Sequence, residues 1–399
     1  ERKYIGDILA DSDSEDDYES RFSTTDTLGF LNRDDFRALL ENRSGSAPPT
    51  ALNLFSKPFP FSRSGSAKAA DEDRTDTDQF AACSPALIAF RGSICKQALE
   101  QAGSRFLQHT LASGSESDRL LIVEELMPSV FSVTTDIFGN YVVQACLDNC
   151  SFLHCQSLIS SLIGSVLELS LHTYGCRVIQ KALEKASEEQ RRKLVSELKG
   201  HVDRCLADQN ANHVIQKSIE VMEYDDIRFI IEAMRPNLLQ WATHCYGCRV
   251  LQRVIEHCPR ILLENEITTL LRYALEISQD AYGNYVVQHL YSHGSRVDRR
   301  VLFKAFAGNY RRLSKHKFSS NVVEKSLQVA EPETLGKIAE EVFCEEYLFE
   351  LMTDRYANFV VQKILEASVG PARNLLISKV QVHTKTLRGY PFGRHVLSA

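Results

Sequence analysis

A six-residue pattern returns along this chain at a nearly constant interval. Residues 139–144, Gly-Asn-Tyr-Val-Val-Gln, show a small residue, a short polar residue, a flat or basic residue, two apolar residues and an amide. Counted at the short polar residue, eight copies run from Ser104 to Asn358, with steps of 36 residues and one final step of 38. A period of this length over so many copies predicts a helical repeat solenoid.

Composition is compatible with one such solenoid. The 399 residues are 44% hydrophobic and 25% charged, and without an apolar run of membrane length we expect no membrane span. The net charge of -6 at first disfavours nucleic-acid binding, but residues 1–81 hold 10 Lys or Arg against 17 Asp or Glu. The remaining 36 basic and 35 acidic residues nearly balance. A nucleic-acid site would therefore depend on the local placement of Arg and His.

The eleven cysteines lack the spacing of a disulfide framework. Cys245 and Cys248 form a single CxxC without a partner pair, and Cys248 belongs to the repeated pattern, so we expect no metal site. Reduced thiols and the lack of a visible secretory signal predict an intracellular protein. Because the chain begins at Glu1 without Met, we expect its native N-terminus to lie outside this sequence.

Residues 1–81 are predicted to form an acidic, Ser-rich and largely disordered tail with a short helix at 34–41. Ser12 and Ser14 lie among acidic residues, where phosphorylation is possible in principle and a solvated acidic tail is the favoured interpretation. A candidate peptide-docking segment contains Phe55, Phe59 and Phe61.

Each repeat is predicted to contain three short helical segments. In the second repeat these are 120–126, 130–133 and the motif helix 140–148, which follows a turn containing Gly139. Polar segments such as 187–190 and 223–226 are expected as loops between units. Partial units are expected to cap the two ends, from residues 85–99 and from the incomplete ninth motif near residue 394.

Positions i and i+4 of a helix share one face, so Asn140 and Gln144 should project together while Val142 and Val143 turn into the core. Stacked repeats would align these polar pairs on the concave face, with Tyr141 and its equivalents beside them. Such a row suits single-stranded bases, whose edges form hydrogen bonds and whose faces stack. Helix capping is the simpler interpretation of the first pair residue, but it does not explain an amide seven times, and one Glu, at the second.

These motifs closely resemble those of the Pumilio (PUF) family of sequence-specific RNA-binding proteins over about residues 84–399. The resemblance implies an all-α, right-handed, crescent-shaped solenoid of eight three-helix repeats with capping half-repeats. It divides the chain into the tail, 1–81, and an RNA-binding domain, 82–399. In this family each repeat contacts one base through a base-edge pair and a stacking residue. The expected base-edge pairs are Ser104 with Gln108, Asn140 with Gln144, Cys176 with Gln180, Asn212 with Gln216, Cys248 with Gln252, Asn284 with Gln288, Ser320 with Glu324 and Asn358 with Gln362. The expected stacking residues are Arg105, Tyr141, Arg177, His213, Arg249, Tyr285, Asn321 and Phe359.

In the family, Asn with Gln binds uracil, Ser or Cys with Gln binds adenine, Ser with Glu binds guanine, and the RNA runs antiparallel to the protein. The implied target is 5′-UGUAUAUA-3′, from the pair of Asn358 and Gln362 at the first base to the pair of Ser104 and Gln108 at the last. An ionised Glu324 only accepts hydrogen bonds, which suits the N1–H and N2–H donors of guanine. Flipping one base out would let the eight repeats accommodate a ninth.

The resemblance further implies a cytoplasmic, monomeric regulator that binds 3′ untranslated regions of mRNA. It would repress translation and promote mRNA decay through protein partners bound to the convex face and to the connection 335–355. No cofactor, metal or catalytic step is expected, and packing or stacking is favoured over catalysis for His172, His213 and His244. Two alternatives stay open, a protein-binding solenoid of the armadillo or HEAT kind and a PUF-like ribosome-assembly factor; intact base-edge pairs disfavour both.

Overall fold

A computed structural model describes residues 83–398 of the chain. The chain divides into two units, Glu1–Thr75 and Asp76–Ala399, and the described residues belong to the second. The predictions for the tail, the helix at 34–41, Ser12, Ser14 and the phenylalanine segment all lie outside the described residues. The predicted domain boundary between 81 and 82 stays a prediction.

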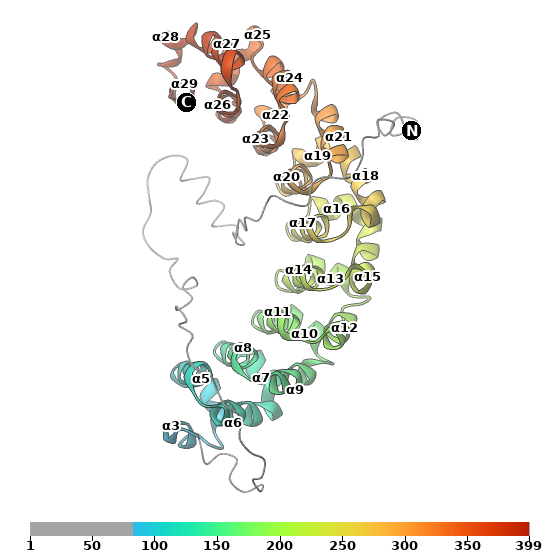
Figure 1. The fold of residues 1–399 in the computed structure, drawn as a ribbon, viewed down its shortest axis with the longest axis vertical. Helices are drawn as coiled ribbons and strands as arrows, with labels where there is room; N and C mark the ends of the chain where they lie inside the picture. The colour runs from blue at the N-terminus through green and yellow to red at the C-terminus, as the bar shows by residue number, and fades with distance from the viewer. Residues whose placement is uncertain (1–82, 399) are drawn as a thin grey trace. The chain divides into compact units, whose positions relative to one another are not determined.

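Most helices of residues 83–398 recur as an outer helix, a short middle helix and a motif helix, stacked along a curved array (Figure 1). The motif helices are α5 (Gln101–Ser113), α8 (Gly139–Asn149), α11 (Gly175–Lys185), α14 (Ala211–Val221), α17 (Gly247–His257), α20 (Gly283–His293), α23 (Ser319–Val329) and α26 (Ala357–Ala367). The outer helices are α6 (Glu116–Leu126), α9 (Phe152–Leu162), α12 (Glu188–Ser196), α15 (Tyr224–Met234), α18 (Glu264–Arg272), α21 (Arg296–Phe306) and α24 (Pro332–Val342).

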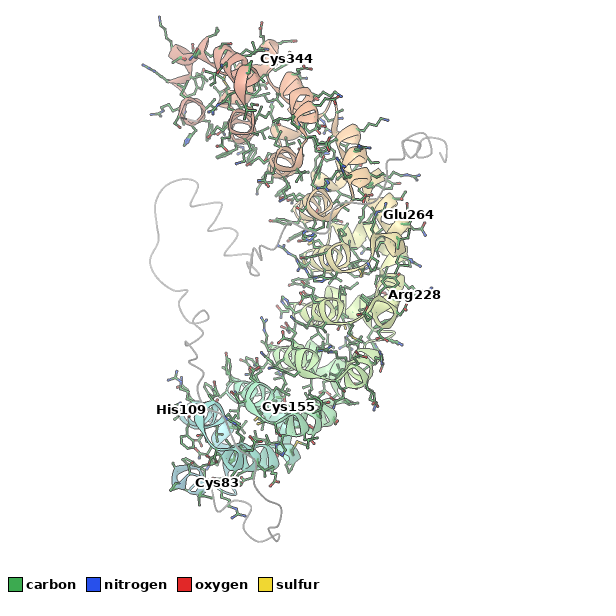
Figure 2. All side chains as sticks on the ribbon, in the orientation of Figure 1. Cys83, His109, Cys155, Arg228, Glu264 and Cys344 are labelled. Carbon is green, nitrogen blue, oxygen red and sulfur yellow. The ribbon has the colours of Figure 1, made fainter. Side chains whose placement is uncertain are left out.

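The middle helices are α4 (Ile94–Ala98), α7 (Val130–Thr134), α10 (Val166–Leu171), α13 (Val202–Ala207), α16 (Leu238–Ala242), α19 (Ala274–Ser278), α22 (Tyr310–Ser314) and α25 (Glu345–Thr353). The 3-10 turns within residues 83–398 are η2 (Met127–Ser129), η3 (Arg235–Asn237) and η4 (Arg260–Leu263). The motif helices line the inner side of the array and the outer helices its convex side (Figure 1). Arg228 and Glu264 extend from that convex side (Figure 2).

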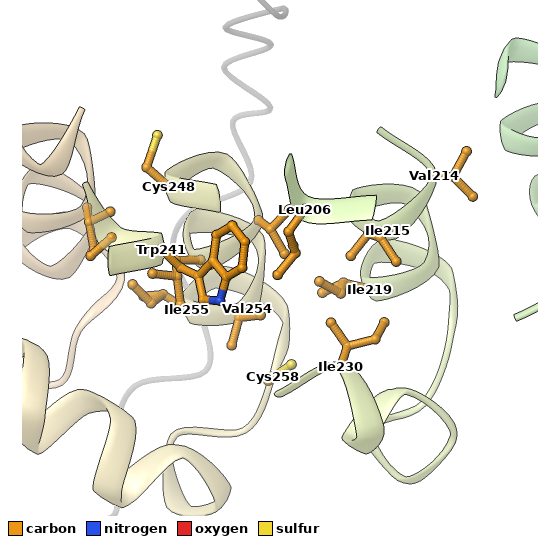
Figure 3. Close-up of a cluster of buried hydrophobic side chains, with 14 of the residues drawn as sticks. Leu206, Val214, Ile215, Ile219, Ile230, Trp241, Cys248, Val254, Ile255 and Cys258 are labelled. Atoms are coloured by element: carbon orange, nitrogen blue, oxygen red, sulfur yellow. The ribbon is translucent and has the colours of Figure 1, made fainter. Parts of the chain in front are cut away.

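One continuous hydrophobic core runs between the inner and outer layers. The apolar pair of the motif, such as Val142 and Val143, is buried in repeats two to eight, as predicted. Figure 3 shows one part of this core, in which Ile219 of α14, Ile230 of α15 and Trp241 of α16 belong to the same cluster. Successive repeats thus bury their apolar faces against each other, which is how a solenoid is stabilised.

Close backbone approach explains the small residue that begins the motif. A Cβ atom on Gly139 would lie 2.5 Å from the carbonyl oxygen of Val133, and one on Gly175 would lie 2.6 Å from that of Leu169. These distances are far below ordinary contact, so a motif helix that begins with Gly is pressed against the middle helix before it. The small residues Ala211, Ser319 and Ala357, which take this position in other repeats, are fully buried there. Gly139 was predicted to lie in a turn before the motif helix, but it is the first residue of α8.

Two polar segments predicted as loops between units are shorter breaks than expected. The chain is non-helical at Ser187 and Glu223, between repeats, but residues 188–190 and 224–226 already belong to α12 and α15. The Ser187 hydroxyl accepts a hydrogen bond from the backbone N–H of Gln190 at 3.3 Å. Ser at the N-cap and acidic residues in the first turn stabilise helix N-termini, so most of the polarity here marks a helix start.

The last step of the pattern is longer because its middle helix is longer. The helix α25 has nine residues where α22 has five. The connection 335–355 is itself helical: it spans most of α24 and all of α25, and Ile338, Leu348 and Leu351 are buried in the core. Partners that use this segment would meet the exposed side of these two helices.

The two ends of the array are closed by additional helices. The helix α3 (Pro85–Ile88) precedes α4, and Leu87 and Ile94 are fully buried there. At the other end, α27 (Gly370–Gln381), α28 (Thr384–Leu387) and α29 (Pro391–Leu397) cover α26 with Leu387 and Val396. These caps cover the apolar faces that the first and last repeats would otherwise expose.

Among the described residues, no helix combines the length and apolar character needed to cross a bilayer. The eleven cysteines all lie in the described part of the chain and are free thiols.

The glycine contacts predict a graded effect on stability. Gly175→Val should lower the free energy of unfolding by about 1–3 kcal/mol, because the new side chain must displace α10 or α11. Gly336→Ala in α24 is the matched control, since its Cβ would meet nothing within 4 Å, and it should raise stability by about 0.5–1 kcal/mol. Urea denaturation of both variants checks this. Equal effects would contradict the close-approach explanation.

Candidate nucleic-acid interface

The eight motif helices form a continuous row, because each one packs directly against the next, from α5 to α26. The base-edge pairs and stacking residues predicted from the sequence all lie in the first two turns of these helices. The structure therefore brings all eight predicted sets side by side along one face, with one set contributed by each repeat.

The first residue of every pair is almost completely buried, which the sequence analysis did not anticipate. Asn140 is 2% exposed, Cys176 1% and Ser320 4%, and the other five fall in the same range. Each of these residues lies one or more positions inside a motif helix whose start is pressed against the preceding middle helix. The first pair residues therefore form the floor of the row.

The second pair residue and the stacking residue of each set lie closer to solvent. Gln288 and Gln362 are half-buried, like the second residue in most repeats, whereas Gln216 and Gln252 are buried. The stacking residues are exposed or half-exposed, with Tyr141 at 44%. The pairs thus lie at the bottom of the row, between stacking residues that rise above it.

In the Asn pairs, both residues are held by hydrogen bonds before any ligand arrives. Asn140 Nδ2 donates to the carbonyl oxygens of Asp136 and Ile137 at 2.9 and 3.0 Å, and Asn140 Oδ1 accepts from Gln144 Nε2 at 3.0 Å. The burial of these amides is possible because their polar atoms are bonded. The same bond from glutamine to asparagine, at 2.9 Å, is present in the other three Asn pairs: Gln216 to Asn212, Gln288 to Asn284 and Gln362 to Asn358.

The Cys and Ser pairs hold their glutamine differently. Gln180 Nε2 donates to the backbone carbonyl of Cys176, and Gln252 Nε2 to that of Cys248, each at 3.0 Å. Burial raises the pKa of the Cys248 thiol to about 12, so it is neutral at pH 7. Gln108 Nε2 donates to Ser104 Oγ at 3.0 Å. The Cys pairs thus lack the bond between side chains that the Asn pairs have, although Gln144 and Gln362 also donate to the backbone carbonyl of their Asn, at 3.4 and 3.2 Å.

The stacking residues lie close enough to interact across repeats. The Arg249 guanidinium carbon lies 4.7 Å from the centre of the Tyr285 ring, a cation–π distance. Burial, followed by the charge of Arg177, lowers the pKa of His213, which favours a neutral ring at this position. A planar group that enters between Arg249 and Tyr285 must part them and would then have a stacking partner on each face.

This interface also contains a set of helix caps that were not predicted from the sequence. Asp136 Oδ1 accepts from the backbone N–H groups of Phe138 and Gly139 at 2.7 and 2.8 Å, at the start of α8. In α17, His244 Nδ1 accepts from Tyr246 and Gly247, both at 3.2 Å. The residues in this position, each four before the first pair residue, are Asp136, His172, Asp208, His244, Asp280, His316 and Asp354.

This cap position correlates with the pair that follows it. Asp always precedes an Asn pair, and His always precedes a Cys or Ser pair. The signal was available in the sequence as the same 36-residue period, one turn upstream of the motif. His172 and His244, for which packing or stacking was favoured, are thus helix-capping acceptors.

An ion-pair ladder also runs beside the pairs and was not predicted. The residue directly after the second pair residue is Lys181 in α11 and Lys217 in α14, and each contacts an acid of the preceding motif helix. Lys181 Nζ lies 3.3 Å from Asp148 Oδ1, and Lys217 Nζ lies 3.1 Å from Glu184 Oε1. This ladder needs two helices side by side, so no local sequence pattern shows it.

The interface matches a known repeat. The sequence profile of the Pumilio-family RNA binding repeat matches the chain eight times, at residues 94–127, 129–163, 165–199, 207–234, 237–262, 273–305, 309–343 and 347–380. Pumilio homolog 12 of Arabidopsis thaliana is 31% identical over 315 residues, which are 77% of this chain and 52% of that protein. The mRNA-binding protein puf3 of Schizosaccharomyces pombe is 43% identical over 77% of this chain and 42% of its own length. The chain thus spans about half the length of these relatives.

Solved structures with the same arrangement contain RNA. The crystal structure of PUF-8 in complex with PBE-RNA has a TM-score of 0.73 and 36% identity, covering 78% of this chain and 93% of that one. The Puf3 RNA binding domain bound to a Cox17 RNA 3′ UTR recognition sequence has a TM-score of 0.74 and 30% identity, covering 78% and 95%.

The histidine caps predict a pH dependence of stability. Burial lowers the pKa of His244 in the folded chain below its ordinary value of about 6.5. The unfolded chain therefore binds the proton first, so this stabilisation is complete above about pH 6.5 and is lost as pH falls through the folded pKa. His244→Asp replaces the imidazole by the cap that other repeats use.

Between pH 7.5 and 5.5 the free energy of unfolding should consequently fall less in His244→Asp than in the wild type. Urea denaturation at several pH values measures both slopes, and the contributions of the other histidines cancel in the comparison. Parallel slopes would contradict the assigned role of His244.

Proposed function

The chain belongs to the Pumilio family of RNA-binding repeat proteins, and on that premise we propose that it binds single-stranded RNA sequence-specifically through its row of base-edge pairs. The observation that supports this most directly is the alternation, on one face, of buried hydrogen-bonding pairs with exposed stacking side chains. Membership of a family of RNA-binding repeats, and not of an enzyme class, agrees with the prediction that the chain has no catalytic step.

The proposed target is 5′-UGUAUAUA-3′, with one base at each pair. Each base would stack on the residue that follows the first member of its pair. Where that residue is aromatic, as Tyr141 is, the stack would stabilise a bound base by about 1–3 kcal/mol. From the 5′ end, the contacts are U at Asn358 and Gln362, G at Ser320 and Glu324, U at Asn284 and Gln288, A at Cys248 and Gln252, U at Asn212 and Gln216, A at Cys176 and Gln180, U at Asn140 and Gln144, and A at Ser104 and Gln108.

The geometry of the pairs supports different bases at different repeats. In the Asn pairs the asparagine occupies the floor and holds Gln Nε2, as in Asn140 and Gln144, which leaves less depth for a base and favours a pyrimidine. In the Cys pairs the glutamine bonds to the backbone, and the small neutral thiol leaves depth for a purine. An ionised Glu324 supplies only acceptors, and among the bases guanine presents two adjacent donors on its edge.

The biological role proposed for this binding is post-transcriptional. We place the chain in the cytoplasm as a monomer on 3′ untranslated regions of mRNA that contain UGUA. There it would repress translation and promote decay through protein partners. The exposed sides of the outer helices, including α24 of segment 335–355, are the proposed partner surface, because the inner face would be occupied by RNA.

Binding to matched RNAs tests the proposal. Fluorescence anisotropy at a stated, near-physiological salt concentration should show at least a hundredfold preference for 5′-UGUAUAUA-3′ over 5′-ACAAUAUA-3′, about 2.7 kcal/mol. The loss would come from unpaired polar groups at the three 5′ bases. Equal, weak binding to both RNAs would favour a solenoid whose partners are proteins.

A swap of one pair tests the register. Ser320→Asn with Glu324→Gln should move the second-base preference from G to U, because the pair then matches that of Asn284 and Gln288. Affinities for 5′-UGUAUAUA-3′ and 5′-UUUAUAUA-3′ measure it. Gln328→Ala, an exposed change in the same helix, is the control and should keep the preference for G. A double variant that still prefers G would show that the register is wrong.

A further inference from the structure

Three potential metal ligands converge beside the base-edge pairs of two repeats. His289 and His293 lie one turn apart on α20, and Glu256 lies on α17, which packs against α20. Their ligand atoms all lie within 4.8 Å of one another. The two imidazole rings are stacked, with centroids 4.4 Å apart and planes at 22°. This cluster is separate from the pairs themselves.

The distance between two of these ligands already suits a metal ion. His289 Nε2 lies 3.5 Å from Glu256 Oε2. Metal–ligand bonds of about 2.0–2.2 Å place neighbouring ligands of a tetrahedral zinc site about 3.3–3.6 Å apart. The third ligand, on the exposed His293, has a ring nitrogen within 4.8 Å of the other two ligand atoms, so a rotation of its side chain completes the set.

The chemistry of His289 supports a ligand role. Its Nε2 is buried and makes no well-formed hydrogen bond within the described residues, since Glu256 Oε2 lies at the distance limit of 3.5 Å, although most buried polar atoms are bonded. Burial, followed by the charge of His293, lowers the pKa of His289 to about 4, so the ring is neutral at pH 7. Neutral imidazole is the form that coordinates metals.

The ion-pair ladder also explains what such an ion would contribute. At the position of His289, α11 and α14 have Lys181 and Lys217, whose ammonium groups reach the acid of the preceding motif helix. In α20 the cation is replaced by an imidazole that faces Glu256. A divalent cation held between them would restore positive charge at this step of the ladder.

The other charged groups around the cluster are compatible with this arrangement. Arg253 Nη1 lies 2.8 Å from Glu256 Oε2, His257 lies on the same helix, and Lys325 approaches from α23. A carboxylate has lone pairs for both an arginine and a metal, and arginine contacts to a ligating carboxylate orient it. The cost is electrostatic repulsion from Arg253 and Lys325, which sets a limit on affinity.

We propose that Glu256, His289 and His293 form a binding site for Zn²⁺ or a similar first-row divalent ion, with a remaining coordination position open to solvent. A set of two imidazoles and one carboxylate binds such ions in preference to Mg²⁺ or Ca²⁺, which prefer oxygen ligands. The proposal is independent of the proposed RNA target, because its site contains none of the base-edge residues.

Calorimetric titration of the whole chain with Zn²⁺, in the absence of RNA, tests the site. The wild type should bind one ion at this site, and His293→Gln should weaken that binding at least tenfold. His289→Lys should do the same while remaining folded, because it recreates the residue of α11 and α14. His109→Gln is the matched control: His109 holds the equivalent position on α5 (Figure 2) and has Ser113 in place of the second histidine.

A competing thiol site is distinguished with Co²⁺ and with Cys344→Ser, which removes the exposed cysteine. Binding through the histidines predicts a visible Co²⁺ spectrum without thiolate charge transfer, and an unchanged affinity in Cys344→Ser. Unchanged affinity in both His289→Lys and His293→Gln would overturn the proposal. So would a loss of binding in Cys344→Ser alone.

Discussion

The close approach between each motif helix and the middle helix before it determines where everything else in the interface lies. A Cβ on Gly139 or Gly175 would collide with a backbone carbonyl, so the motif helix is pressed inward at its first residue. The first pair residue follows directly and is therefore buried, and the stacking residue comes next and points outward. The burial of the helix start thus determines how deeply the row of base-edge pairs lies below the surface.

Burial of polar residues at this depth is possible only because the backbone around them is already bonded. The Asp or His cap takes the free N–H groups at the helix start, and in the Asn repeats the Asn side chain takes the carbonyls that remain. Side chains held in this way lose little conformational freedom when a ligand binds, which favours affinity and selectivity. Preorganisation is consequently distributed over the whole array and does not depend on one rigid pocket.

The sequence predicted most of this architecture because the repeat period fixes register without knowledge of distances. The helix around Asn140 begins and ends within one residue of the predicted bounds 140–148, and all eight sets of pair and stacking residues share one face. The predicted breaks at 187–190 and 223–226 are too long, because the residues after Ser187 and Glu223 already form the first turns of α12 and α15 and polar residues mark helix starts as well as breaks. Whether the proposed bases occupy the eight pairs is a matter for the binding experiments.

Features that join two repeats could not be predicted in this way. Lys217 and Glu184, or His289 and Glu256, are 33 residues apart and meet only because adjacent motif helices pack side by side. Nothing in either local sequence specifies that contact. The near-total burial of Asn140 was missed for a related reason, since it depends on the packing of the helix start against α7, although its hydrogen-bond partners are local.

The ion pairs between lysine and aspartate or glutamate on the inner face affect the electrostatic attraction between this face and a polyanion. Lys181 and Lys217 each have a carboxylate neighbour on the preceding motif helix, so these two ammonium groups contribute less positive potential to the inner face than unpaired lysines would. In the proposed complex these two residues would therefore release fewer condensed counterions. More of the affinity would then come from base edges and base faces, which a random polyanion without the matching bases does not supply.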